Sequence, residues 1–64
     1  MLNTEKLKKL MEHHGFNNRK LADAIGVTEQ FVHYMVNGKK QPSLAVYSDM
    51  CNVLGVSKDE LVVD

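Results

Sequence analysis

Residues 17–38 constrain the fold most strongly, because two short helical patterns follow each other there with room between them only for a turn. The first pattern carries Leu21, Ala22 and Ile25 on one face. Gly26 follows, and glycine ends a helix well because it adopts the left-handed backbone conformation at little steric cost. A small alanine one turn earlier lets a second helix approach closely. The segment therefore predicts two helices that cross steeply.

The second pattern begins at Thr28, whose hydroxyl is suited to capping a helix, and runs to about Asn37. It carries Val32 and Met35 three residues apart as its buried pair, and Gly38 ends it as a glycine ends the first pattern. Two helices joined by so short a turn form a helix-turn-helix, a motif whose second helix can lie in the major groove of DNA.

Further helical patterns flank this motif. A first helix is expected from Asn3 or Thr4 to about His14, and a fourth over residues 44–54 after a cap at Ser43. The fourth helix has its expected core stripe at Leu44, Tyr47, Met50, Cys51 and Leu54.

Residues 57–60, Ser-Lys-Asp-Glu, match a capping box and predict a last short helix that carries Leu61. The predicted fold class is therefore all-α, a compact five-helix domain with the helix-turn-helix at helices 2 and 3 and a single domain over residues 1–64. Cys51 is the only cysteine, so the core must form without an internal disulfide. A lone thiol, no signal-peptide pattern and no long apolar run favour a cytoplasmic protein without a membrane segment.

The formal net charge is zero, which counts against nucleic-acid binding because neutralised phosphates supply most non-specific affinity. The charges are nevertheless unevenly distributed. Residues 1–40 hold seven basic and four acidic residues, a net charge of +3, whereas residues 41–64 hold one basic and four acidic residues, a net charge of −3. The helix-turn-helix lies in the basic part, so the acidic end is expected to lie away from DNA.

Three segments in this order, LADAIGVT, VNGKKQPS and LGVSKDEL, resemble the lambda-repressor-like DNA-binding domains of the phage repressor and Cro family. The resemblance covers roughly Leu7 to Leu61. It implies a five-helix domain that binds operator DNA, usually as a symmetric homodimer, and regulates transcription, often as a repressor in a phage or another mobile element. Such a dimer forms either in solution or only on DNA.

The helix-turn-helix geometry assigns roles by position, since the first turn and exposed face of the second helix reach base edges. Glutamine can pair with adenine and a carboxylate can accept from cytosine. We therefore expect base contacts from Glu29, Gln30, His33 and Tyr34. The resemblance to the phage repressor and Cro family implies base contacts at three of these positions, Glu29, Gln30 and Tyr34. Amide, hydroxyl and basic groups at the edges of the motif are the expected phosphate contacts: Asn18, Arg19, Thr28, Asn37, Lys39 and Lys40.

Phe31 and Val36 depart from the family pattern and make the expected exposed side of the second helix unusually apolar. Phe31 has three interpretations: it touches a thymine methyl, packs under the first helix of the motif, or belongs to a protein interface. The alternative function is therefore a protein-interaction module that keeps the fold with weak or no DNA binding. The expected dimer surface is the apolar end of the chain, Leu61, Val62 and Val63.

Enzymatic and metal-binding functions find little support in the sequence. No nucleophile–base pair, pair of carboxylates or phosphate-binding glycine loop is present, so we expect no enzyme and no cofactor. His13 and His14 diverge by about 100° on a helix, and neither His33 nor Cys51 completes a paired ligand spacing. We therefore expect no metal site.

Overall fold

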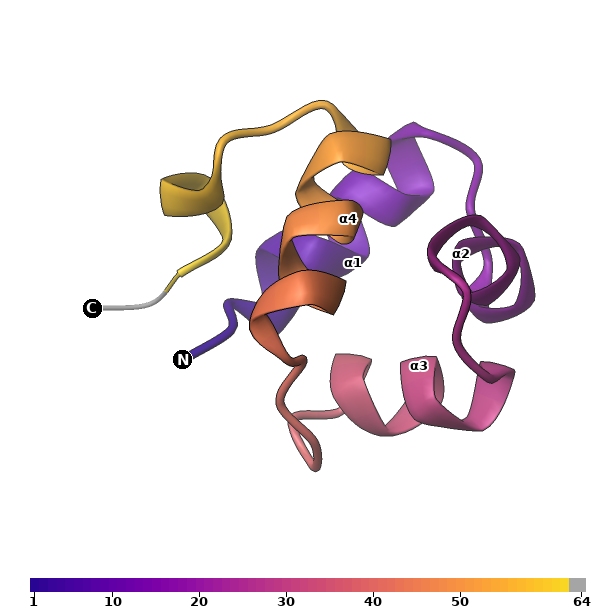
Figure 1. The fold of residues 1–64 in the computed structure, drawn as a ribbon. Helices are drawn as coiled ribbons and strands as arrows, with labels where there is room; N and C mark the ends of the chain where they lie inside the picture. Colours follow the sequence, from indigo (N-terminus) through magenta and orange to yellow (C-terminus); the bar gives the residue numbers. More distant parts are fainter. Residues whose placement is uncertain (63–64) are drawn as a thin grey trace.

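The computed structural model describes residues 1–62 and contains four α-helices and one short 3-10 helix, η1 (Figure 1). Their bounds are α1 Thr4–His13, α2 Asn18–Ile25, α3 Glu29–Val36, α4 Leu44–Leu54 and η1 Lys58–Leu61. Near the two ends of the chain, Leu2 pairs with Val62 in an isolated antiparallel bridge. None of the helices in this part of the chain is both long and apolar enough to span a membrane.

Each α-helix begins at a polar side chain that accepts a hydrogen bond from a backbone N–H group of the first turn. This satisfies a donor that has no partner within the helix, and the expected caps at Thr28 and Ser43 are confirmed. The capping residues are Asn3, Asn17, Thr28 and Ser43.

The turn between α2 and α3 sets the angle at which the two helices cross. Gly26 has φ of 74° and ψ of 34°, the left-handed conformation, and the N–H of Val27 donates to the carbonyl of Ala22 at 3.0 Å. This bond closes α2 as a Schellman motif does. The Ala22 side chain is only 2% exposed, so the two helices meet over a small residue as the sequence predicts.

The core lies between α1, α2, α3, α4 and η1. Its fully buried members are Leu7, Leu21, Val32, Met35, Met50, Leu54 and Leu61. Leu2, which the helical patterns do not reach, is also buried, and its N–H donates to Oε1 of Gln41 at 3.2 Å. Cys51 is buried too, and burial raises the pKa of its thiol, which suits a packing role.

The expected fifth helix is wrong in type: residues 58–61 form a single 3-10 turn. Four residues are too few for successive α-helical bonds, and Ser57 makes no side-chain capping bond. The turn is held instead by long-range contacts. The Leu61 side chain is buried, its carbonyl accepts from the N–H of Asn3 at 2.8 Å, and the Tyr47 hydroxyl donates to the Lys58 carbonyl.

Two side-chain placements also differ from the sequence prediction. Leu44 is 79% exposed, because it is the first residue of α4 and lies beyond the end of the core. Val36 is 7% exposed, because the last turn of α3 packs onto the core, so it does not belong to the exposed side of the helix. Helical periodicity alone therefore does not show at which residue the buried face of a helix begins or ends.

Replacing Gly26 by alanine is expected to lower the free energy of unfolding by about 1–2 kcal/mol, because an L side chain in the left-handed region meets its own backbone. A Cβ at this position would have no other atom within 4 Å, so the loss arises from backbone conformation alone. Gly26→Asn is the matched control and should lose less, since asparagine adopts this conformation more readily. Urea unfolding measures both, and an alanine variant as stable as the natural protein would contradict the account.

Candidate nucleic-acid interface

Helix α3 divides into a buried face and an exposed face. Val32, Met35 and Val36 face the core, whereas Glu29, Gln30 and His33 are exposed and Tyr34 is half-buried. In Figure 1, α3 lies along the lower edge of the molecule, with α1 and α4 above it. The expected base-contacting residues therefore lie on the side of α3 that a ligand can approach.

Tyr34 is the centre of a small cluster on this exposed side. The Nε2 atom of Gln30 donates to the Tyr34 hydroxyl at 3.1 Å, one helical turn away. The ammonium of Lys40 lies 5.7 Å from the centroid of the Tyr34 ring, a distance typical of a cation–π contact. Thr28, Gln30, Phe31, Tyr34 and Lys40 together line an open depression of about 220 Å³.

The loop after α3 is tied to the end of that helix by backbone hydrogen bonds. The Lys39 N–H donates to the Tyr34 carbonyl at 2.8 Å and the Gly38 N–H to the Met35 carbonyl at 3.1 Å, with Gly38 at φ of 75°. The Asn37 side-chain amide donates to the His33 carbonyl at 2.8 Å. These bonds fix the backbone of the exposed Lys39 beside the exposed face of α3.

The other edge of α3 lies beside the start of α2. Glu29 lines an open groove of about 680 Å³ together with Asn18 and Arg19. The rest of its wall comes from α1, from the segment between α1 and α2, and from Val36 at the end of α3. Asn18 is half-buried and Arg19 is exposed. A backbone phosphate at the rim of this groove would meet the amino-terminal end of α2, where an anion is favoured.

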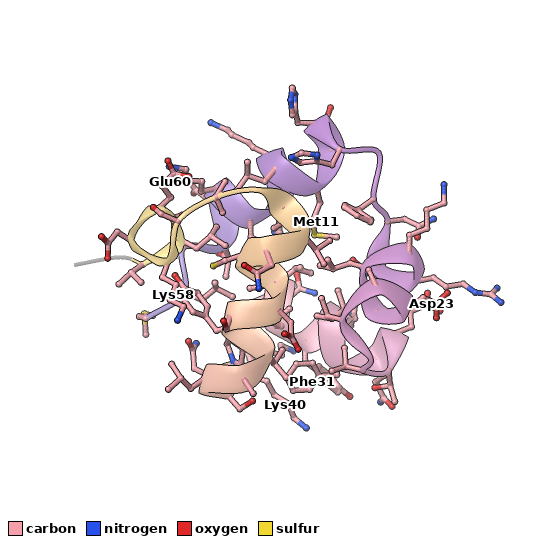
Figure 2. The ribbon with its side chains drawn as sticks, turned by 45° about the horizontal axis from the view of Figure 1, so that its top comes forward. Met11, Asp23, Phe31, Lys40, Lys58 and Glu60 are labelled. Atoms are coloured by element: carbon pink, nitrogen blue, oxygen red, sulfur yellow. The ribbon has the colours of Figure 1, made fainter. Side chains whose placement is uncertain are left out.

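Charge is separated between two sides of the molecule. Figure 2 shows Phe31 and Lys40 at one edge and Glu60 at another, far across the view. Asp59 and Glu60 belong to η1, which contacts α4 and α1. Asp59 and Glu60 therefore do not adjoin the exposed side of α3.

Phe31 is half-buried and packs against the core cluster, while the rest of its ring lines the depression beside Tyr34. Because Val36 is buried, these two residues do not form a continuous exposed apolar face. The unusual apolarity of α3 in the sequence thus arises partly from a residue that faces inward.

The expected dimer surface is only partly available. The Leu61 side chain is fully buried, so it offers no surface to a second copy, and this assignment is corrected. Val62 is 43% exposed, and Val63 lies outside the described residues. The structure adds Met1, 84% exposed, which no sequence pattern marks, and Leu44, 79% exposed, which the sequence pattern assigns to the core. A depression of about 170 Å³ is lined by Met1, Leu2, Gln41, Pro42, Tyr47 and Val62.

Metal ligands do not gather in the described part of the chain. Across residues 1–62, no three histidine, cysteine or acidic side chains lie close enough together to hold a metal ion. The rings of His13 and His14 meet edge to face, with centroids 5.1 Å apart, and Cys51 lies in the core.

Comparison with known proteins gives two matches. A family model described as helix-turn-helix matches residues 7–61. The chain is 36% identical over 58 residues to the SPbeta prophage-derived uncharacterized HTH-type transcriptional regulator YonR of Bacillus subtilis (strain 168). The match covers 91% of this chain and 54% of that protein, so the chain spans about half the length of this curated relative.

Proposed function

Because the chain belongs to the Cro/CI-type helix-turn-helix family, we propose that it is a sequence-specific regulator of transcription that binds double-stranded DNA. Helix α3 lies in the major groove and α2 crosses the phosphate backbone, as in other helix-turn-helix proteins. A repressor would act simply by occupying a promoter. The family and the relative both point to a regulator of this kind rather than to an enzyme.

The observation that carries the proposal is the composition of the exposed face of α3. Four side chains that can donate to or accept from base edges, Glu29, Gln30, His33 and Tyr34, lie on the face turned away from the core. Lys39 and Lys40 follow in the exposed loop, where they can reach a phosphate at the edge of the same groove. Asn18 and Arg19 supply the corresponding groups on the other edge, and Thr28 and Asn37 lie at the two ends of α3.

The rival function, a protein-interaction module that has lost DNA affinity, depends on an exposed apolar face. Val36 is buried and Phe31 is half-buried against the core, so the described surface of α3 offers little apolar area to a protein partner. The zero net charge is the other observation that supports a protein-interaction function. Because acidic η1 lies away from the α3 face, the local charge near Lys39 and Lys40 matters more than the sum.

Selection from a randomised duplex library at moderate salt tests the function directly. The protein is expected to enrich a half-site motif, and Gln30→Ala should relax the preference at one base position by about tenfold, because a paired glutamine–base contact is lost. Asn52→Ala is the matched control, since it removes an exposed side-chain amide from the carboxyl-terminal half of α4, where no DNA or dimer contact is proposed.

Failure to enrich any motif, with a circular dichroism spectrum that shows a folded helical protein, would contradict sequence-specific binding. That result would favour the alternative function, a protein-interaction module, and the exposed part of Phe31 would be the first surface to test by substitution.

A homodimer follows from the size of the domain. One module of this kind buries only about 600–1,000 Å² on DNA, less than most specific complexes, so two copies on half-sites one helical turn apart are expected. We place the contact between them at Met1, Leu44 and Val62, the large apolar side chains exposed in the described part of the chain. Met1 and Val62 line one depression with Pro42, and Leu44 follows two residues later.

Combined Leu44→Ser and Val62→Ser replacement tests this contact. Cooperative binding to two half-sites should fall from a Hill coefficient near 2 to about 1, while binding to a single half-site stays the same, because both side chains lie outside the core. Ala45→Ser, at the exposed neighbour of Leu44, is the control. Unchanged cooperativity in a gel-shift titration would show that the contact lies elsewhere.

A further inference from the structure

The side chain of Tyr34 is in contact with two residues that the proposed function gives different tasks. Its hydroxyl accepts from Nε2 of Gln30 at 3.1 Å, and its ring lies 5.7 Å from the Lys40 ammonium. Its backbone carbonyl also accepts from the Lys39 N–H at 2.8 Å. The side-chain amide of Gln30, a proposed base contact, and the loop of Lys39 and Lys40, proposed phosphate contacts, thus both contact one half-buried tyrosine.

The hydrogen bond decides what Gln30 can offer to a base. A glutamine amide has two N–H donors and one carbonyl oxygen, and Tyr34 occupies one of the donors. One donor and the oxygen remain. Adenine presents one donor and one acceptor in the major groove and matches that pair, whereas guanine presents two acceptors and requires two donors. A glutamine held in this way should favour adenine over guanine.

The same bond also reduces the cost of recognition. An exposed glutamine has several rotamers, and fixing them on binding opposes affinity. The rotamers of Tyr34 are restricted as well, because the residue is half-buried and lies beside Phe31 and Lys40. Gln30 is therefore oriented before DNA arrives.

We propose that Tyr34 is a positioning residue that holds Gln30 in an orientation that selects adenine over guanine, so that the base preference belongs to the pair and not to Gln30 alone. This proposal rests on the proposed DNA-binding function. It assigns Tyr34 a role beyond any base contact of its own. Gln30 contacts the hydroxyl of Tyr34, and Lys40 lies over the ring of the same residue.

Tyr34→Phe is the informative variant, because it removes the hydroxyl and keeps the ring that Lys40 covers. The control is Ser48→Ala in α4, which also removes a hydroxyl, at a residue that carries no proposed DNA or dimer contact. Each variant, the natural protein, Gln30→Ala and the double variant Gln30→Ala/Tyr34→Phe are taken through the same duplex selection.

The natural protein is expected to prefer adenine to guanine by about tenfold or more at the position that depends on Gln30. Tyr34→Phe should reduce that preference at least about threefold at the Gln30-dependent position, in addition to any change at a base that Tyr34 itself contacts. Ser48→Ala should leave the adenine preference unchanged, and the double variant should resemble Gln30→Ala. Affinity for non-specific DNA should change less than about twofold in Tyr34→Phe, because the phosphate contacts remain.

Two outcomes would overturn the inference while leaving the proposed function intact. One is an adenine preference that is the same in Tyr34→Phe and the natural protein, and the other is guanine at the Gln30-dependent position. Absence of any enriched motif would overturn the proposed function instead. The bond itself is then tested without DNA: the side-chain amide signals of Gln30 in a ¹⁵N-labelled sample should shift in Tyr34→Phe, and unchanged signals would refute the bond.

Discussion

The steep crossing of α2 and α3 is the constraint on which the rest of the structure depends. Gly26 in the left-handed conformation turns the chain within a few residues, and Ala22 lets the helices meet without a bulky side chain between them. Because α2 also contacts α4, the same crossing fixes α3 relative to the core. The exposed face of α3 is held in place by this packing and not by its own residues.

This arrangement separates stability from recognition along a single helix. Val32 and Met35 are fully buried, and burying such side chains contributes roughly 1.5–3 kcal/mol each. Exposed positions such as Gln30 and His33 contribute little, since surface substitutions usually change stability by less than about 0.5 kcal/mol. The exposed face of α3 can therefore change without loss of the fold.

Most of the fold could be predicted from the sequence because its signals are local. Four polar caps and the glycines that follow the helices mark the ends of α1 to α4 to within a residue or two. The errors concern features that depend on distant contacts. Residues 58–61 form a 3-10 turn because Leu61, Asn3 and Tyr47 hold them, and burial of Leu2 depends on its bridge to Val62.

The candidate site shows the same division. Gln30 and Tyr34 are four residues apart on a helix, so their contact follows from periodicity, although the sequence reading treated them as separate base contacts. The position of Lys40 over the Tyr34 ring depends on the path of the loop, and no local pattern encodes that path. The exposure of Leu44 and the burial of Val36 depend likewise on where the core ends.

The most direct test of the central claim, that the exposed face of α3 reads DNA, is an NMR titration of the ¹⁵N-labelled protein with a duplex that it has selected. The account predicts that amide signals of residues 29–34, of the loop 37–40 and of the start of α2 shift together as DNA is added. Signals of the carboxyl-terminal half of α4 should change little. Shifts confined to α4 and η1, with α3 unaffected, would contradict it.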